Sequence, residues 1–308
     1  MLKSMQDIVD AAQSLPTQTL VVAMADDPHV LEAVERAREA GIVASYLIGD
    51  EPAIRQTLDA LGYAAENHRI EHEADAEKAC KMAVKRVSQA DDHFLMKGLV
   101  DTSVILKAAL SKQDGLRGPN RLSHVSVMEI PTYHKLLIMS DGAMNIAPDV
   151  DIKQEIIENS LSVTRSLGID LPNIGVIAAV EKVNPKMPAT LDAQNLILRN
   201  QSGMLTGCRI GGPFALDNAI NREAAEHKGI TDPMAGDVDM VLMPQIESGN
   251  VFYKSMMFLA HAKSASVIVG ATRPIVLTSR ADSTESKLYS IALGALVAAR
   301  ASKSTIKS

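Results

Sequence analysis

Short apolar runs alternate with amphipathic segments along this chain, and the alternation constrains the fold more than any other feature. Residues 20–24 read as a buried strand, and residues 28–40 as a helix that begins at Pro28 and ends at Gly41. Residues 42–48 form the next strand run. A strand, a helix and a second strand make a βαβ unit, which predicts a parallel sheet covered by helices.

The same unit recurs to the end of the chain. Further strands are expected at 93–96, 135–139, 174–179, 238–243, 266–269 and 274–277, and helices at 102–110 and 283–300. A length of 308 residues fits two domains or one large α/β unit. Residues 115–121, rich in Gly, Pro and Asn, are the best candidate for a hinge.

Composition excludes several classes of protein. A net charge of -6 without a basic stripe argues against a dedicated nucleic-acid binder. The two cysteines, Cys80 and Cys208, stand in no paired motif, which suits a reducing compartment and excludes a cysteine-rich metal site. The N-terminus lacks the apolar core of a signal peptide, and no apolar run is long enough for a membrane span. We therefore expect a cytoplasmic protein that binds neither nucleic acid nor membranes.

The most informative polar segment is 278–285, where a strand ends and a helix begins. Ser279 and Arg280 stand there with Asp282 and Glu285, which have the spacing of a helix capping box. Free N–H groups at a helix start attract anions, and an arginine grips phosphate at two points. The segment therefore indicates an anion site, although a capped helix with a surface arginine explains the same residues.

Three other polar turns follow expected strands, at 140–145, 211–217 and 247–250. Ligands of open α/β sheets bind beyond the carboxyl ends of the strands, so these turns are candidate binding segments. Each also has a purely structural explanation. Ser248 or Asn250 suits a helix cap, and the paired glycines at 211 and 212 suit a tight turn.

Signatures of other chemistries are missing. The first strand run is followed by residues 25–28, Ala-Asp-Asp-Pro, rather than by a glycine-rich dinucleotide fingerprint, and there is no P-loop or nucleophile elbow. Neither His68 with His72 nor His124 with His134 has a convincing third metal ligand. We expect no metal and no cofactor.

Taken together, the ordered turns resemble the phosphate acetyl/butyryltransferase family, with the butyryltransferase branch the more similar. The matching stretches are Met96-Lys97-Gly98-Leu99-Val100, residues 140–148, residues 211–219, residues 244–250 and residues 274–285. They extend over most of the chain in family order.

The resemblance implies a fold and a reaction. The fold is two α/β/α domains with mostly parallel sheets, of the isocitrate/isopropylmalate-dehydrogenase-like type, with an active-site cleft between them. We expect one domain at 1–125 plus 275–308 and the other at 126–274, in a homo-oligomer that is a dimer or larger. The family exchanges an acyl group directly between coenzyme A and phosphate, so the expected partners are acyl-CoA or CoA and phosphate.

Site residues carry over unevenly. Ser279 and Arg280 match the family's pair, in which the serine stabilises the transition state and the arginine holds phosphate. The aspartate proposed as the base in the acetyl branch is here Ser286, so either Asp282 or Glu285 is expected to take that role. The substrate-binding residues expected on the matching stretches are Ser140, Asn145, Gly212, Pro213, Glu247, Gly249, Asn250 and Ser283.

Three alternatives stay open at this point. One is a phosphate acetyltransferase. A second is a metal-dependent hydroxy-acid dehydrogenase of related fold, for which Asp237 and Asp239 alone make no metal cluster. The third is a non-catalytic acyl-CoA-binding protein, which the presence of the Ser279–Arg280 pair disfavours.

The Arg280 assignment is testable by substitution. Arg280→Lys keeps the charge and loses the planar two-point grip, so phosphate-dependent turnover should fall substantially, and Arg280→Ala should lower it further. Phosphate titrations measure the effect, and thermal melts of each variant control for folding. A wild-type phosphate KM and kcat in Arg280→Ala would place the anion site elsewhere.

Overall fold

The computed structural model describes residues 1–279 and 282–305, and these form two compact units. Unit 1 comprises Met1–Ser4 and Arg121–Ser264, and unit 2 comprises Met5–Asn120 with the chain from Ala265 onward. The sequence places the divisions after residues 125 and 274, and the structure places them after Asn120 and Ser264.

Unit 2 is built on a mostly parallel sheet with the strand order β3-β2-β1-β4-β11-β10. Parallel pairing joins β3 to β2, β2 to β1, β1 to β4 and β4 to β11, whereas β10 is antiparallel to β11. The strands are β1 (Gln18–Ala23), β2 (Val43–Gly49), β3 (Arg69–His72), β4 (His93–Lys97), β10 (Lys263–Val269) and β11 (Ile275–Val276). The carboxyl ends of β1, β4 and β11 therefore lie at one edge of the sheet.

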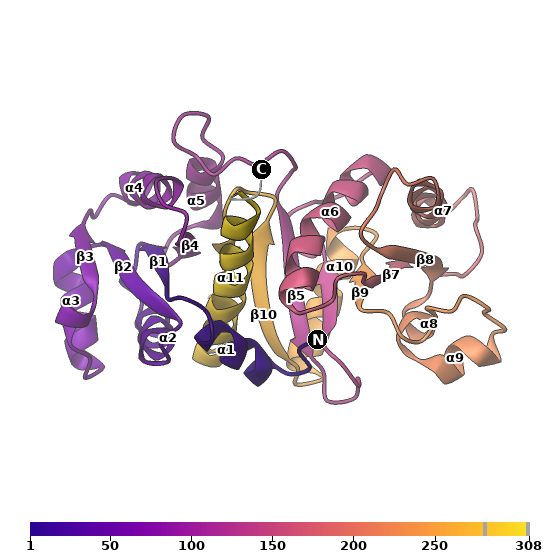
Figure 1. Cartoon of the computed structure of the whole chain (residues 1–308), viewed down its shortest axis with the longest axis horizontal. Coiled ribbons are helices and arrows are strands. Elements are labelled where there is room, and N and C mark those ends of the chain that lie inside the picture. The colour runs from indigo at the N-terminus through magenta and orange to yellow at the C-terminus, as the bar shows by residue number, and fades with distance from the viewer. Residues whose placement is uncertain (280–281, 306–308) are drawn as a thin grey trace. The chain divides into compact units, whose positions relative to one another are not determined.

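Helices cover both faces of this sheet (Figure 1). Helix α11 packs against α1 and α2, while α4 packs against α5 and the sheet. The helices are α1 (Met5–Gln13), α2 (Pro28–Glu39), α3 (Glu51–Ala60), α4 (Ala76–Ser88), α5 (Thr102–Ala109) and α11 (Thr284–Thr305), with a short 3-10 helix at Ala65–Asn67. The buried strand residues Val21, Leu47 and Leu95 show that this core is largely aliphatic.

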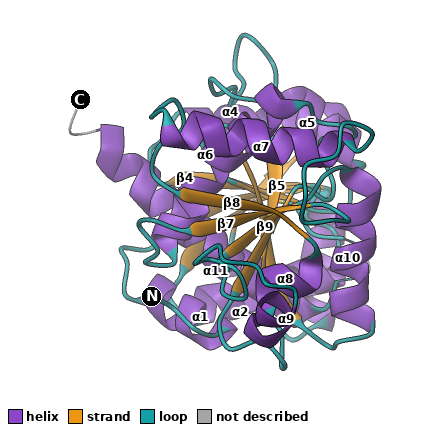
Figure 2. Cartoon of the chain, turned by 90° about the vertical axis from the view of Figure 1, so that its right-hand side faces the viewer, coloured by secondary structure: helices purple, strands orange, loops and turns teal. Residues whose placement is uncertain are grey.

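Unit 1 repeats the layered design with the strand order β5-β6-β9-β7-β8. Its strands are β5 (Ser123–Glu129), β6 (Leu137–Ser140), β7 (Asn173–Ile177), β8 (Arg209–Phe214) and β9 (Met240–Leu242). Its helices are α6 (Val150–Ser166), α7 (Pro188–Gln201), α8 (Leu216–Ile220), α9 (Arg222–His227) and α10 (Ile246–Phe258). Figure 2 shows α6 and α7 on one side of β7, β8 and β9, with α8 and α9 on the other.

Aspartates start several helices directly after strands or short loops. The carboxylates of Asp27, Asp50, Asp75 and Asp149 each accept a hydrogen bond from a backbone N–H in the first helical turn. Such caps satisfy amides that a helix start leaves without a partner.

The predicted α/β class and the mostly parallel sheets are confirmed. Every strand predicted from the sequence is present, and β3, β5 and β8 are additional. The prediction of a turn at 211–217 was wrong at its start, because Gly211, Gly212 and Pro213 belong to β8. Similarly, Glu247, Gly249 and Asn250 lie inside the first turns of α10 rather than before it. Within the described residues no helix is both long enough and apolar enough to span a membrane.

Candidate functional site

The turn that follows β11 in unit 2 presents Ser279 at the surface. The Ser279 N–H donates to Oδ2 of Asp282 at 2.7 Å, and the Asp282 N–H donates to the Ser279 carbonyl oxygen at 3.1 Å. This reciprocal pair holds the serine backbone against the start of α11. Arg280, the residue expected to hold phosphate, lies outside the described residues.

The cap of α11 differs from the expected capping box. The helix begins at Thr284, and the residue before it, Ser283, accepts a hydrogen bond at its Oγ from the Ser286 N–H at 3.1 Å. Glu285 accepts instead from the Tyr289 hydroxyl at 2.7 Å. Asp282 was therefore wrongly predicted as the capping residue, because its carboxylate binds the turn and Ser283 caps the helix.

Two buried lysines lie beside this turn, and sequence reasoning missed them as functional residues. Lys97 ends β4, and its Nζ donates to the carbonyl oxygens of Gly98 and Val100 at 3.1 and 3.2 Å. Lys287, in the first turn of α11, donates from Nζ to the Asp282 carbonyl oxygen. Burial lowers the pKa of Lys287, although the nearby Asp282 and Asp27 charges act against that shift.

Both lysines line one small cavity of about 20 Å³, together with Asp27, Thr278 and Ser279. A signal for Lys97 was present in the Met96-Lys97-Gly98 stretch, which the family resemblance already included. Lys287 carried the weaker signal of lying four residues after Ser283, and therefore on the same helix face.

In unit 1, the segment after β6 is organised by Asp141. Its Oδ1 accepts from the N–H groups of Ala143 and Met144 at 2.8 and 2.9 Å, and its Oδ2 accepts from Asn145 Nδ2 at 2.7 Å. Ser140 is completely buried and donates from Oγ to the His124 carbonyl oxygen at 2.9 Å. Ser140 and Asn145 thus support the turn, and their contact with a substrate stays a prediction.

The first turn of α10 lies directly on this segment. A Cβ atom added at Gly249 would come within 2.5 Å of the Asp141 carbonyl oxygen, so only glycine permits the approach. Asn250 Nδ2 also points to the Gly142 carbonyl oxygen at 3.4 Å. The structure therefore brings together Ser140, Asn145, Gly249 and Asn250 within unit 1, with Glu247 exposed on the same helical turn.

Gly212 and Pro213 lie farther along the same sheet. They belong to β8, which is separated from β6 by β9 and β7. At the usual strand spacing this places them about 14 Å from the β6 end. Gly212 has a φ of 127° and lies against the Val176 carbonyl oxygen, where a Cβ atom would be 2.8 Å away. The glycine at 212 thus has a backbone explanation in β8, and contact of Gly212 and Pro213 with a substrate stays a prediction.

A cavity of about 720 Å³ opens beside the unit 1 turns. Its walls come from the segment after β6 (Ala147 and Pro148), the end of β7 (Ala178 and Ala179) and the segment before α10 (Pro244 and Gln245). Helices α6 and α7 complete it, with the buried ammonium group of Lys153 paired to Asp192. The lining is mostly apolar, with a few polar groups, which is usual for a small-molecule site.

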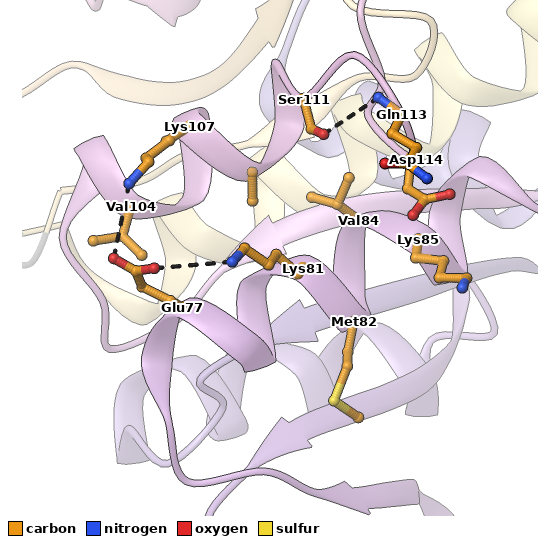
Figure 3. Close-up of a pocket in the computed structure, with 11 residues that line it drawn as sticks. Glu77, Lys81, Met82, Val84, Lys85, Val104, Lys107, Ser111, Gln113 and Asp114 are labelled. Atoms are coloured by element: carbon orange, nitrogen blue, oxygen red, sulfur yellow. Dashed lines mark hydrogen bonds and ion pairs between the residues drawn. The ribbon is translucent and has the colours of Figure 1, made fainter.

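A second groove, of about 490 Å³, lies between α4 and α5 of unit 2 (Figure 3). The ammonium groups of Lys81 and Lys107 both lie 3.9 Å from the Glu77 carboxylate, and the apolar Val84 and Val104 also line the groove. None of the expected site residues lines this groove. It is therefore separate from the turns at the strand ends.

No group of three or more His, Cys, Asp or Glu side chains in residues 1–279 and 282–305 is arranged to hold a metal ion. The expected independence from metal and cofactor stays a prediction, as does the expected cleft between the two units.

Comparison with known proteins relates these turns to one family. The sequence model of the phosphate acetyl/butaryl transferase family matches residues 62–295. The phosphate butyryltransferase of Clostridium acetobutylicum is 42% identical over 97% of this chain and 99% of its own length. The phosphate acetyltransferase of Thermotoga maritima is 44% identical over 91% of this chain and 95% of its own length.

Solved structures agree with the sequence comparison. The crystal structure of a branched-chain phosphotransacylase from Enterococcus faecalis V583 superposes with a TM-score of 0.81 and 32% identity, covering 92% of this chain and 99% of that one. The sequence match therefore extends to the three-dimensional arrangement of the same elements. The predicted membership is confirmed, and the chain belongs to the phosphate acetyl/butaryl transferase family of transferases.

Proposed function

We propose that this protein transfers a short acyl group between coenzyme A and inorganic phosphate, with butyryl or a similar chain preferred over acetyl. The observation that carries the proposal is the near full-length similarity to a phosphate butyryltransferase. The similarity to a phosphate acetyltransferase supports the same reaction with a different chain. The presence of Ser279 and Arg280 in the sequence, which match the family's pair, supports catalysis rather than binding alone.

The reaction places clear demands on the site. A phosphate oxygen attacks the thioester carbonyl carbon, and a C–O bond forms as the carbonyl oxygen gains negative charge. The C–S bond then breaks, which releases acyl phosphate and the CoA thiolate. We propose that the hydroxyl of Ser279, an exposed residue, donates to the developing oxyanion, and one such donor is typically worth about 3–4 kcal/mol.

In the reverse direction the CoA thiol must lose a proton, and two carboxylates are candidates for the base. Asp282 accepts from the Ser279 backbone and Glu285 from the Tyr289 hydroxyl. A carboxylate has about four lone-pair sites, so neither is saturated by one hydrogen bond. The direct bond to Ser279 favours Asp282, because it places that carboxylate beside the proposed oxyanion donor.

The 720 Å³ cavity of unit 1 is proposed to receive acyl-CoA. Pockets for drug-sized ligands measure about 300–1,000 Å³, so this volume exceeds what phosphate or a four-carbon chain needs. Its apolar lining suits a pantetheine arm, and the exposed Lys186 at its rim offers a cation for the phosphates of CoA.

We also propose a cytoplasmic homo-oligomer, a dimer or larger. Burial raises the pKa of both cysteine thiols to about 11, which keeps them unreactive. Helix α10 and the residue after it expose Val251, Phe258 and Leu259 by 65%, 63% and 79%, an apolar surface suited to a second copy. Light scattering should give a multiple of 33.0 kDa, and a monomer mass would reject the oligomer.

The function is tested by thiol release from acetyl-, propionyl-, butyryl- and isobutyryl-CoA with phosphate. We expect the highest kcat/KM for a three- to five-carbon chain, because each methylene in a pocket discriminates by about 1–3 kcal/mol. A higher value for acetyl-CoA would reverse the chain preference, and no phosphate-dependent release would reject the reaction.

EDTA should leave the rate of acyl transfer unchanged, and a loss of rate that a divalent ion restores would contradict metal independence.

The acyl-CoA cavity is tested by filling it. Ala179 is exposed at the cavity wall, so Ala179→Trp adds bulk there without overpacking the core. We expect the KM for acyl-CoA to rise about tenfold or more while the KM for phosphate stays within twofold, since about 1.4 kcal/mol of lost binding is a factor of ten. Leu171→Trp, at an exposed position outside the cavity lining, is the matched control. An unchanged acyl-CoA KM in Ala179→Trp would move that substrate elsewhere.

A further inference from the structure

Lys287 is a buried cation whose hydrogen bonds are only partly used. Lys287 is 3% exposed, and its Nζ donates to the Asp282 carbonyl oxygen. An ammonium group has three donors, so two remain. Among the described residues no carboxylate oxygen lies within ion-pair distance of Nζ, and Asp27 and Asp282 act on it only at longer range.

A cation in this state is expensive to bury. Ammonium groups inside proteins are ordinarily paired or fully hydrogen-bonded, because desolvation costs several kcal/mol without such compensation. A neutral side chain would satisfy the Asp282 carbonyl at lower cost. The charge at position 287 therefore indicates an anion that arrives from outside the chain.

The surroundings indicate where that anion binds. Lys287 and Lys97 line the same cavity as Ser279, at the edge where the hydrogen-bonded strands β4 and β11 end. The start of α11 adds the positive end of a 22-residue helix. Asp27 also lines the cavity, so two ammonium groups and a helix start face one carboxylate there, and positive charge is in excess.

Cavity size limits what enters. The volume of about 20 Å³ is close to the space that one water-sized group occupies, so a whole phosphate does not fit. A single oxygen of an anion does fit, provided that the rest of the anion stays at the mouth beside Ser279. Inorganic phosphate, and the transferred phosphoryl group of the acyl phosphate, have this shape and charge.

We propose that Lys287 binds one oxygen of the phosphate that takes part in acyl transfer, with Lys97 lining the same oxygen pocket. This proposal rests on the proposed function and assigns its phosphate subsite to the buried side of the Ser279 turn. The Lys287 ammonium group then offsets the negative charge of the phosphate from the buried side of the turn, and Ser279 lies on the side of the thioester.

Two substitutions distinguish phosphate binding by the Lys287 charge from support of the turn by its hydrogen bond. Lys287→Met removes the ammonium group at similar size, and Lys287→Gln keeps a donor for the Asp282 carbonyl while removing the charge. If Lys287 only supports the turn, Gln should restore phosphate binding. If it binds phosphate by charge, both variants should raise the phosphate KM about tenfold or more and leave the acyl-CoA KM within twofold, as expected for a charged hydrogen bond.

Lys135→Met is the matched control, because the Lys135 side chain is also largely covered, at 9% exposed, but pairs with Asp237 and Asp239 in unit 1. It should lower the melting temperature and keep the phosphate KM. Such a result separates a loss of stability from a loss of phosphate binding.

Phosphate-induced stabilisation gives a readout that does not depend on turnover. With CoA present, inorganic phosphate should raise the melting temperature of the wild type, and sodium chloride at equal ionic strength should not. The shift should be lost in Lys287→Met and Lys287→Gln and retained in Lys135→Met. If the wild type shows this shift without acyl transfer, the proposed function fails and the anion site stands. A wild-type shift or phosphate KM in Lys287→Gln overturns the assignment, and so does a wild type that phosphate does not stabilise.

Discussion

Parallel pairing of β1, β4 and β11 is the constraint on which the rest of unit 2 depends. It places the residues after β4 and β11 at one sheet edge, although they are about 180 positions apart in the sequence. Lys97 and Ser279 become neighbours only through this register, in which Val276 pairs with Met96. A shift of one residue along either strand would turn the side chains of that strand to the opposite face and separate them.

The turn after β6 in unit 1 and the turn after β11 in unit 2 are each held by a carboxylate. The Asp141 carboxylate accepts hydrogen bonds from N–H groups and from the side-chain amide of its own turn. The Ser140 hydroxyl donates to the His124 carbonyl oxygen. Ser279 is exposed, and its backbone N–H is held by the Asp282 carboxylate. A preorganised site requires a backbone that is held in this way by polar groups of its own turn.

Chain preference within the family is a matter of small energies. Relatives named for butyryl and for acetyl transfer are almost equally similar to this chain, at 42% and 44% identity. Butyryl and acetyl groups differ by two methylenes, so enzymes that prefer one or the other differ in pocket contacts rather than in fold. Overall sequence identity therefore does not distinguish the two preferences. The family resemblance places Ser286 where the acetyl branch has an aspartate, so this position offers no carboxylate. The Ser286 N–H donates to the Ser283 hydroxyl oxygen.

The alternation of apolar runs and amphipathic segments was enough by itself to determine the α/β class, the parallel sheets and the order of the polar turns, because strand and helix periodicities are local properties of the chain. Strands such as β3, which is only partly buried, and β8, which contains two glycines and a proline, lack that local signal and form because a neighbouring strand is present to pair with. The Ser279–Arg280 pair was recognisable from residue order. Residue order did not separate Ser283 from Asp282 as the cap of α11, because both residue types cap helices. Only the tertiary structure decided that Gly249 lies on Asp141 and that Lys287 is buried beside Lys97. Burial and the pairing of distant strands depend on contacts between residues far apart in sequence, and no local pattern records them.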